Sequence, residues 1–368
     1  MVRMMATNCR MATTLWLAVV SWVVMIISPA FTFAQSTTYN ATDVPSLLAA
    51  AASVNRNPGQ SAVIQIAPGT YLLTESLLLI ARSVSLQGQP SLSNVSLVCS
   101  TETSTAVLFQ PPSESTNTSL SITRMAFSGC SNTSVRAVFP SKGLASMRLT
   151  GVTFSNNTGS EAGGLLVNGG GNFTAELSSC TFSSNTASTP PDFHFPAFAA
   201  NAALITLGGG AASRVSVMGC SFVGNLHGDL LEDVFSPHST VVSALSKSLV
   251  SSALGVVCEG NLTGRQSNIS SYIVNVSDSH FEENTGLSSA LLLASAEDLY
   301  TAWPLAMSSF EVSLNALTFT KNMGIMGGGA VGMFNVTSCS IDGSQFHDNH
   351  AGILTTVSLP YHLLRLYS

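Results

Sequence analysis

Apolar and polar residues alternate along several short stretches of this chain. In the clearest stretch, residues 173–182 (FTAELSSCTF), apolar or small residues occupy every second position, which is the pattern of a β-strand with one buried face. A shorter apolar stretch, GLLV at 164–167, precedes it, and the glycine turn NGGGN at 168–172 separates the two. Because this region shows no helical periodicity, the pattern predicts short strands joined by tight turns.

These strands accompany a recurring motif, Phe-x-x-Asn. The motif occurs six times, and a seventh copy, FSGC at 127–130, has Cys130 in place of the Asn. Successive motif Phe residues are 27, 28, 40, 59, 38 and 27 residues apart, so the shortest intervals define the period of a repeat protein. The motif residues are Phe127, Phe154, Asn157, Phe182, Asn185, Phe222, Asn225, Phe281, Asn284, Phe319, Asn322, Phe346 and Asn349.

Each repeat predicts one coil of a solenoid, because it contains three short strands separated by Gly and Asn turns. We therefore expect an all-β, single-domain, right-handed parallel β-helix. Equivalent residues of successive coils would lie about 4.8 Å apart. The motif Phe residues would then form one buried column and the motif Asn residues a column at the turn. Asn tolerates the left-handed backbone of a tight turn, and its amide can bond to the coils above and below.

The longer intervals between motifs predict insertions. We expect inserted loops near 187–201, 226–240 and 295–304, the first because two adjacent prolines cannot lie in a central strand. The 59-residue interval is about twice the repeat, so we expect it to contain one coil without the motif, passing through residues 241–260.

The first 34 residues have the pattern of a signal peptide. Residues 15–27 are almost continuously apolar, Pro29 interrupts this run, and small residues end at Ala34. A membrane anchor is the alternative, but a run of about 13 residues is shorter than the roughly 20 that span a bilayer. We therefore expect a secreted chain without a membrane span after signal removal. Residues 35–90 would form an N-terminal cap and the first coils, and residues 91–368 the remaining repeats.

The amino-acid composition limits which classes of partner this protein is expected to bind. Charged residues make up 9% of the chain, the net charge is −6, and no cluster of Lys and Arg occurs, which argues against nucleic acid as a partner. Asn-x-Ser/Thr sequons are moderately enriched and mark candidate glycosylation sites in an exported protein. They are Asn40, Asn94, Asn117, Asn132, Asn156, Asn172, Asn261, Asn268, Asn275 and Asn335.

Six cysteines remain after the predicted signal peptide, an even number that suits an oxidising compartment. Cys180 and Cys220 each lie two residues before a motif Phe. Stacking would bring their Cα atoms to about 4.8 Å, within the range that a disulfide accepts. We expect a disulfide between them, with two buried free thiols as the alternative. No Cys-x-x-Cys pair occurs, so no zinc site is expected.

Two resemblances support the fold. The Phe-x-x-Asn motif, together with AGGLL at 162–166, GGGAA at 208–212 and GGGAV at 327–331, resembles the repeat of polymorphic outer-membrane proteins, in which GGA-I/L/V and FxxN alternate. The N-terminal part, DVPSLLAAAAS at 43–53 followed by VIQIAPGTYLLTESLLL at 63–79, resembles the opening of the pectin-lyase-like superfamily. The second resemblance implies a short helix near the N-terminus. We expect this helix to cap the first coil, because an open solenoid end exposes unpaired strand edges, and a membrane-binding helix at 44–52 is the alternative. This fold hosts lyases, hydrolases, adhesins and structural walls, so it does not specify a function.

Candidate functional residues are few. Two positions after the motif Phe, successive repeats carry Glu283, Lys321 and Asp348, which would stack as acid, base and acid. They are candidate catalytic residues, and a surface salt ladder is the alternative. The insertion at 226–238 contains candidate binding residues for calcium or a sugar, and an exposed acidic loop is the alternative. These are His227, Asp229, Glu232 and Asp233.

The sequence therefore favours a secreted, extracellular, non-enzymatic β-helix. Its partners would be extracellular glycans or cell-surface proteins bound along its faces. The alternative, implied by the pectin-lyase-like resemblance, is a polysaccharide lyase or glycoside hydrolase. Such lyases use acidic calcium ligands, so calcium is expected only under that alternative, and otherwise no cofactor or metal.

Overall fold

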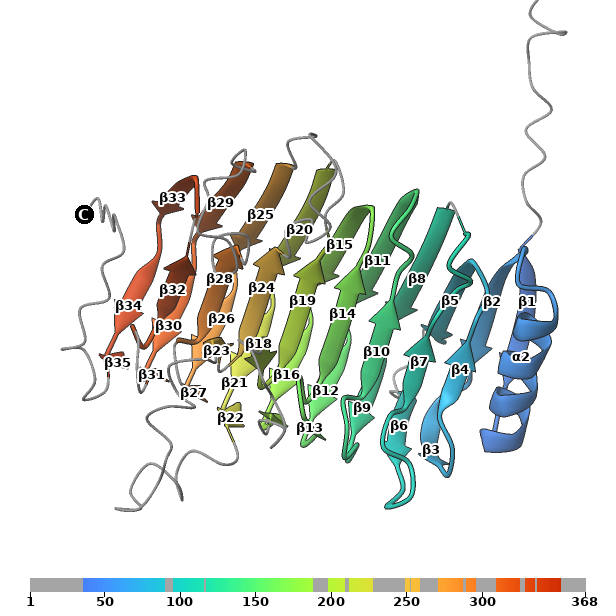
Figure 1. Ribbon diagram of the computed structural model, residues 1–368. Helices are drawn as coiled ribbons and strands as arrows, with labels where there is room; N and C mark the ends of the chain where they lie inside the picture. The colour runs from blue at the N-terminus through green and yellow to red at the C-terminus, as the bar shows by residue number, and fades with distance from the viewer. Residues whose placement is uncertain are drawn as a thin grey trace, which may run out of the picture. The chain divides into compact units, whose positions relative to one another are not determined.

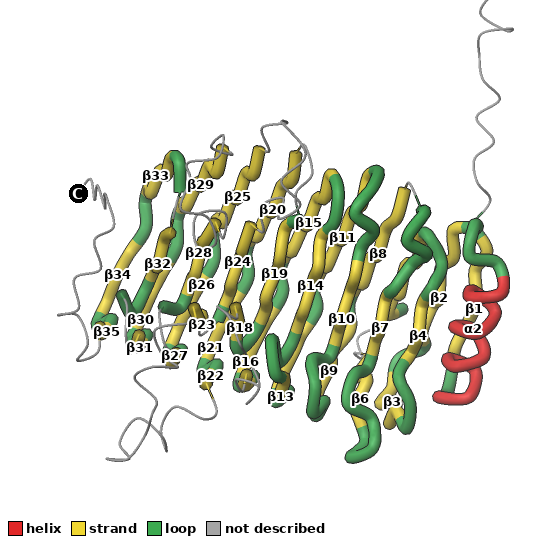
Figure 2. Tube along the Cα trace, viewed as in Figure 1, coloured by secondary structure: helices red, strands yellow, loops and turns green. Residues whose placement is uncertain are grey.

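The computed structural model describes residues 36–89, 95–115, 117–187, 198–208, 212–227, 249–251, 253–258, 271–286, 289–295, 309–324, 328–334 and 336–351. Met1–Ser36 and Thr37–Ser368 are separate units, and the elements below all belong to Thr37–Ser368. The described part of this unit is an all-β parallel β-helix with one helix at its N-terminal end, as expected (Figures 1 and 2).

Each coil that is described in full contributes one strand to each of three long sheets, which we call A, B and C, and all strand pairs are parallel. Sheet A has ten strands among the described residues, and each begins a coil or lies before the first one. Its strands alternate buried and outward-facing residues, as the period-2 pattern predicts. They are β1 (Thr37–Ala41), β2 (Ser61–Ile66), β5 (Ser83–Gly88), β8 (Asn117–Thr123), β11 (Leu144–Thr150), β15 (Asn172–Ser178), β20 (Ala212–Met218), β25 (Ser271–Ser277), β29 (Ser309–Asn315) and β33 (Ser338–Asp342).

Sheet B follows sheet A in each coil and contains the motif Phe residues. Its strands are β3 (Gly69–Leu73), β6 (Val95–Cys99), β9 (Met125–Ser128), β12 (Thr153–Ser155), β16 (Thr181–Ser183), β21 (Ser221–Val223), β26 (His280–Glu282), β30 (Thr318–Thr320) and β34 (Gln345–His347). The short sheet D comes directly after the motif Asn. It contains β13 (Thr158–Gly159), β17 (Thr186–Ala187), β22 (Leu226–His227), β27 (Thr285–Gly286), β31 (Met323–Gly324) and β35 (His350–Ala351).

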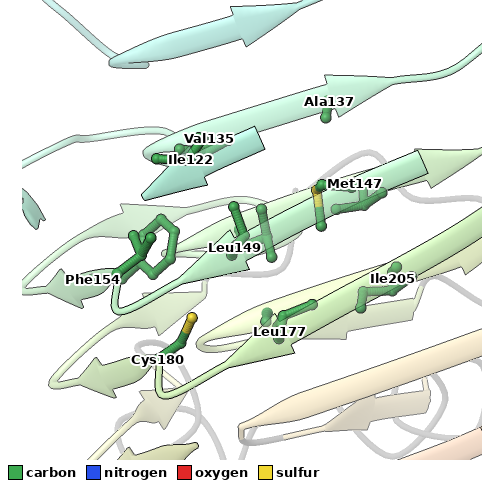
Figure 3. Close-up of a cluster of buried hydrophobic side chains, with 14 of the residues drawn as sticks. Ile122, Val135, Ala137, Met147, Leu149, Phe154, Leu177, Cys180 and Ile205 are labelled. Atoms are coloured by element: carbon green, nitrogen blue, oxygen red, sulfur yellow. The ribbon is translucent and has the colours of Figure 1, made fainter. Parts of the chain in front are cut away.

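Sheet C completes each coil. Its strands are β4 (Leu77–Leu79), β7 (Val107–Phe109), β10 (Val135–Val138), β14 (Leu165–Gly169), β19 (Ala203–Leu207), β24 (Leu254–Cys258), β28 (Leu291–Ser295) and β32 (Val331–Phe334). Side chains from sheets A, B and C meet in one continuous interior, where Leu149, Phe154 and Ile205 lie in the same apolar cluster (Figure 3).

A short helix covers the N-terminal end of the stack, as the sequence implies. Helix α2 (Val44–Arg56) begins with a capping box, because Asp43 accepts a hydrogen bond from the Ser46 N–H at 2.8 Å and Ser46 accepts one from the Asp43 N–H at 3.1 Å. Asn55 fixes its other end by donating to the Leu78 carbonyl at 2.7 Å. The apolar face of the helix is buried against the first strands. It therefore covers strand edges that would otherwise be open.

The motif Phe residues form the predicted column. Successive rings are stacked with centroids 4.8 to 5.3 Å apart and planes 2° to 15° apart. Six of the seven side chains are fully buried, whereas Phe346, in the last described coil, is 46% exposed. The column therefore continues through all seven motif copies and has an exposed end.

The motif Asn residues form a buried hydrogen-bonded ladder. Asn225 is representative: its Nδ2 donates to the Phe182 carbonyl of the preceding coil at 3.1 Å and to Asn284 Oδ1 of the following coil at 2.9 Å. Its Oδ1 accepts from the backbone N–H of Asn185 at 3.0 Å. The amide thus connects three coils, as predicted.

The left-handed turn residue is one position earlier than the sequence pattern suggested. We expected the motif Asn to have the left-handed backbone. Instead, the preceding residue has φ between +50° and +71° in every copy, because the chain must reverse before the Asn side chain can turn inward. The residues are Gly129, Asn156, Ser184, Gly224, Glu283, Lys321 and Asp348.

The 59-residue interval contains no additional coil, so that prediction is wrong. Phe222 pairs directly with Phe281, and β20 pairs directly with β25 along its length. Strand β24, within the segment expected to form the extra coil, is the sheet C strand of this same coil. The additional residues are therefore insertions, since uninterrupted pairing on both sheets leaves no space for another layer.

The predicted loops lie largely outside the described residues, but the described parts of two insertions form strands. Strand β18 (Phe198–Ala200) pairs with β23 (Leu249–Ser251) in a separate two-stranded sheet. Ala200 lies in a second apolar cluster with Leu166 and Leu204, whose side chains project from the outer side of sheet C. The insertions thus bury part of that outer side. Within the described residues, no helix is both long enough and apolar enough to cross a membrane.

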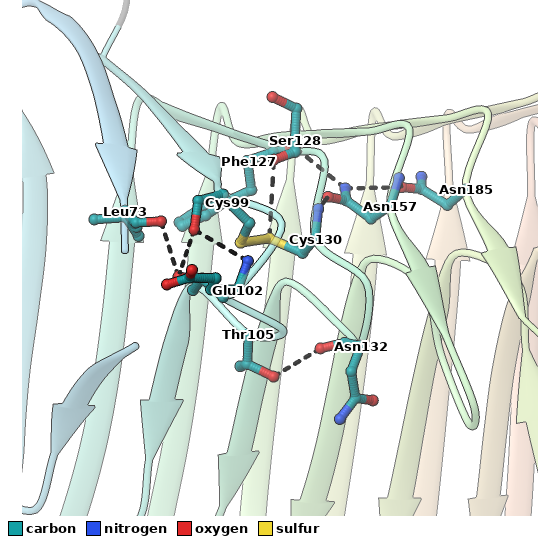
Figure 4. Close-up of a disulfide and its surroundings, with 12 residues drawn as sticks. Leu73, Cys99, Glu102, Thr105, Phe127, Ser128, Cys130, Asn132, Asn157 and Asn185 are labelled. Carbon is teal, nitrogen blue, oxygen red and sulfur yellow. Dashed lines mark hydrogen bonds between the residues drawn. A yellow bond between two sulfur atoms is a disulfide. The ribbon is translucent and has the colours of Figure 1, made fainter. Parts of the chain in front are cut away.

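The expected disulfide between Cys180 and Cys220 does not form. Both thiols are free and buried, and the Cys180 N–H donates to the Cys220 sulfur at 3.4 Å. Residues at one position of successive coils hold their side chains parallel, which points the two sulfurs in the same direction. A disulfide instead connects Cys99 and Cys130, with Cα atoms 4.9 Å apart (Figure 4).

The Cys99–Cys130 bond is diagonal. Val98 pairs with Ser128, so Cys130 lies one residue beyond the position opposite Cys99, and the side chains can approach each other. Cys130 occupies the Asn position of its motif, and its N–H donates to Asn157 Oδ1 at 3.1 Å. The disulfide therefore lies at the N-terminal end of the Asn ladder, next to Asn157. In the chain-entropy account, closing a loop of this length stabilises the fold by about 3–4 kcal/mol.

Candidate functional surface

The outer face of sheet A is a continuous polar surface, which we call the sheet A face. Three outward positions in each strand lie in register with the next strand, so the exposed side chains form columns. Ser and Thr predominate. The first column contains Ser61, Ser83, Ser119, Ser146, Thr174, Arg214, Ile273, Glu311 and Ser338. The second contains Val63, Ser85, Ser121, Arg148, Glu176, Ser216, Asn275, Ser313 and Ser340. The third contains Gln65, Gln87, Thr123, Thr150, Ser178, Met218, Ser277, Asn315 and Asp342.

The hydroxyl groups of this face lie close enough to interact across strands. Ser83 Oγ and Ser119 Oγ are 2.6 Å apart, and Ser178 Oγ donates to Thr150 Oγ1 at 3.2 Å. Each hydroxyl can donate one hydrogen bond and accept two. The face therefore offers rows of closely spaced donors and acceptors with little net charge.

A shallow depression lies near the centre of the sheet A face. Arg148 on β11 and Glu176 on β15 occupy directly paired positions, and the Arg148 Nε donates to Glu176 Oε2 at 2.8 Å. Their side chains are 65% and 45% exposed, so this ion pair contributes at most about 1 kcal/mol to stability. The depression has a volume of about 310 Å³. It is lined by Arg148, Thr150, Glu176, Leu177, Ser178, Ser216 and Met218.

The predicted catalytic column lies on a different side of the molecule. Glu283 and Lys321 follow β26 and β30, which are paired, and Lys321 Nζ lies 3.3 Å from Glu283 Oε1. Asp348 occupies the same position in the last coil. The Lys321–Glu283 pair is more than half exposed, and His280 contacts Glu282 at 3.1 Å beside it. Among the described residues, Glu283 and Lys321 therefore form one exposed ion pair, and the structure does not decide between a salt ladder and a catalytic role.

The other predicted sites are only partly within the described residues. His227 ends β22, whereas Asp229, Glu232 and Asp233 lie outside the described part of the chain. Across the described ranges, no group of three or more His, Cys, Asp and Glu side chains is placed to hold a metal ion.

The sequons occupy several kinds of position. Among them, Asn40, Asn117 and Asn156 are exposed, and Asn132, Asn172 and Asn275 are partly buried. Asn275 belongs to the sheet A face, and Asn172 accepts a hydrogen bond from the Ala212 N–H at 3.0 Å. Asn94, Asn261, Asn268 and Asn335 lie outside the described residues.

Sequence reasoning missed the Arg148–Glu176 pair. The two residues are 28 positions apart, which equals the interval between the neighbouring motif Phe residues. Opposite charges separated by one repeat are thus the signal that would have found them, because equivalent positions of successive coils become neighbours.

Comparison with known proteins assigns no family. No protein family matches the sequence, and no curated protein matches it either. One solved structure, ORF18 of Geobacillus virus E2, aligns with 85% of this chain at 10% sequence identity and a TM-score of 0.29. This chain covers 60% of that protein.

Proposed function

We propose that this protein is an extracellular, non-enzymatic β-helix that binds an extended neutral polysaccharide along the sheet A face. The observation that carries the proposal is the register of that face, which aligns columns of Ser, Thr, Asn and Gln side chains across the strands. Sugars present hydroxyl groups that need the same mixture of donors and acceptors. A polymer lying across the strands would meet an equivalent row of partners at each coil.

The depression at Arg148 and Glu176 would hold one sugar of the bound polymer in a defined orientation. The guanidinium supplies donors in a planar arrangement and the carboxylate supplies acceptors, so the pair can bind vicinal hydroxyl groups from both sides. The net charge of −6 disfavours a polyanionic ligand. Neutral polysaccharides therefore fit this face better than acidic ones.

Several features support an extracellular location. The first 34 residues have the signal-peptide pattern, and ten sequons follow. Disulfides such as Cys99–Cys130 persist in oxidising compartments. We further propose that the protein is related to the pectin-lyase-like superfamily and that its repeats are of the polymorphic outer-membrane protein type. The GGA and FxxN motifs support this relationship.

Binding assays with matched variants test the proposal. The purified protein would be titrated with soluble β-glucan, xylan and mannan, and with polygalacturonate as the acidic comparison. Ser216→Arg, which fills the depression, should weaken binding of the preferred neutral polymer by about tenfold or more. Ser183→Arg, an outward position on sheet B, is the matched control and should bind normally. Equal loss in both variants, or no binding to any neutral polymer, would contradict the proposal.

The second candidate is a polysaccharide lyase or hydrolase, which the contact between Lys321 and Glu283 favours because it places a base beside an acid. Incubation with uronic-acid polymers, with and without calcium, distinguishes it from binding alone. Depolymerisation that Glu283→Gln abolishes would establish this activity. An unchanged polymer size would exclude it for those substrates.

A further inference from the structure

A sequon lies on β25 of the sheet A face, beside the depression. Its residues are Asn275, Val276 and Ser277. Because the side chains of a strand alternate between its two faces, Asn275 and Ser277 both point outward, whereas Val276 is buried. A sequon in this register therefore presents its asparagine and its hydroxyl residue on the same outer surface.

The neighbours of Asn275 place it at the border of the depression. Asn275 pairs with Ser216 of β20 and Ser277 pairs with Met218, and both β20 residues line the depression. On the other side, Asn275 pairs with Ser313 of β29. Serine has a short side chain, so neither partner of Asn275 crowds the space above its amide. A group attached to Asn275 would stand one strand spacing, about 4.8 Å, from the strand that lines the depression.

Other sequons lie along two further borders of the same face. Asn40 lies on β1, in register with Gln65 of the third column, and is exposed. Asn117 and Asn172 are the first residues of β8 and β15. Among the described residues, sheet A contains six strands between β1 and β25, which are β2, β5, β8, β11, β15 and β20 (Figure 1). Glycans at these asparagines would border a tract of six strands, about 24 Å long, on three sides.

We propose that Asn275 carries an N-linked glycan and that this glycan ends the polysaccharide-binding tract of the sheet A face at β20. The limit on binding rests on the proposed function, whereas the modification itself does not. In the transfer, Asn275 Nδ2 forms a bond to C1 of an oligosaccharide, the bond from C1 to the diphosphate of a lipid carrier breaks, and the amide releases one proton. An N-linked glycan is bulky, so a polymer bound over β5 to β20 meets it and leaves the face there.

Two substitutions of Ser277 separate the effect of the glycan from the effect of the side chain. Ser277→Ala removes the sequon and keeps Asn275, whereas Ser277→Thr changes the same side chain and keeps the sequon. Thr158→Ala removes the sequon of Asn156, an exposed residue in the turn after β12, and is the control for loss of a glycan elsewhere. The full-length chain and each variant would be produced in a eukaryotic secretory host, and their glycopeptides would be mapped by mass spectrometry.

Hydroxyl-radical footprinting then locates the end of the tract. Each form would be compared with and without the neutral polymer at about ten times its Kd. Ile273, an outward residue of β25, should react at an unchanged rate in the wild type, in Ser277→Thr and in Thr158→Ala. In Ser277→Ala it should react about tenfold more slowly with the polymer present, because the polymer can then cover β25. Met218 should be protected in every form.

Two results overturn the proposal. One is a wild-type protein whose Asn275 carries no glycan, and the other is a change in Ile273 reactivity that is the same with and without the sequon. If no form binds a neutral polymer, the proposed function fails and the limit on binding fails with it. The glycopeptide map decides the occupancy of Asn275 in either case.

Discussion

At the scale of single residues, the motif Asn is the best-defined structural element of the repeat. Each internal Asn satisfies a backbone carbonyl of the coil before it and bonds to the Asn on either side. The sequence could predict this column, because identical residues that recur once in each coil must stack. It could not locate the left-handed residue, since that position contains Gly, Asn, Ser, Glu, Lys and Asp in different copies. A backbone requirement without a constant side chain leaves no pattern to detect.

Replacing Asn225 should be costly. Asn225→Ala removes the acceptor for the Asn185 N–H and a donor to the Phe182 carbonyl, which leaves two buried backbone groups unsatisfied. Each such group costs about 1–3 kcal/mol, so the free energy of unfolding should fall by about 2–6 kcal/mol in a denaturant titration. Asn349→Ala is the matched control at the exposed end, where we expect about 1 kcal/mol. Equal effects at both positions would show that the ladder does not stabilise the interior.

The motif Phe residues allow a similar comparison. Phe222 is fully buried between Phe182 and Phe281, so Phe222→Ala should destabilise the fold by about 3–5 kcal/mol. Phe346 has one described ring neighbour and is half-exposed, so Phe346→Ala should cost about 1 kcal/mol. Chemical denaturation measures both values. A small effect at Phe222 would contradict the stacked interior.

At the scale of elements, insertion lengths limited what the sequence could predict. The strands of the uninterrupted repeats were predictable, because alternation and motif spacing agree there. The interval between Phe222 and Phe281 was misread, because a length close to two periods is also the length of one coil with two large insertions. Only the direct pairing of β20 with β25 distinguishes these cases. Helix α2 was recognisable from its resemblance to other β-helix openings, and its capping box explains where it begins.

The stability of the first turn of helix α2 should depend on pH. The hydrogen bonds from the Ser46 hydroxyl and backbone hold the pKa of Asp43 below its usual value of 3.8. A lowered pKa means that the cap's contribution is complete above the unfolded-state pKa and is lost as the pH falls through the folded-state pKa. The protection factors of the amides of residues 45–48, which correct exchange rates for their intrinsic pH dependence, should therefore fall on acidification from about pH 5 to about pH 3. Asp43→Asn keeps the acceptor without titrating and should abolish this fall if Asp43 causes it.

At the scale of the whole molecule, regular stacking creates both the stability of the solenoid and its proposed binding surface. The sequence predicted the fold class, which follows from the repeat period. It also indicated a surface with few charges, which follows from the composition. It did not identify the sheet A face, since recognising that face requires the register of every coil, including those whose spacing is disturbed by insertions. The same limitation explains the disulfide: Cys99 lies in a coil without the motif, so no alignment of motifs could bring it beside Cys130.

Hydroxyl-radical footprinting with a bound polysaccharide tests the central claim most directly. The neutral polymer that binds best would be added at saturation, and the modification of each side chain compared with the free protein. We predict protection of Arg148 and Met218 on the sheet A face, while Leu72, exposed on sheet B, and His280 react as before. Protection centred on Glu283 and Lys321, or spread equally over sheets A and B, would contradict binding along the sheet A face.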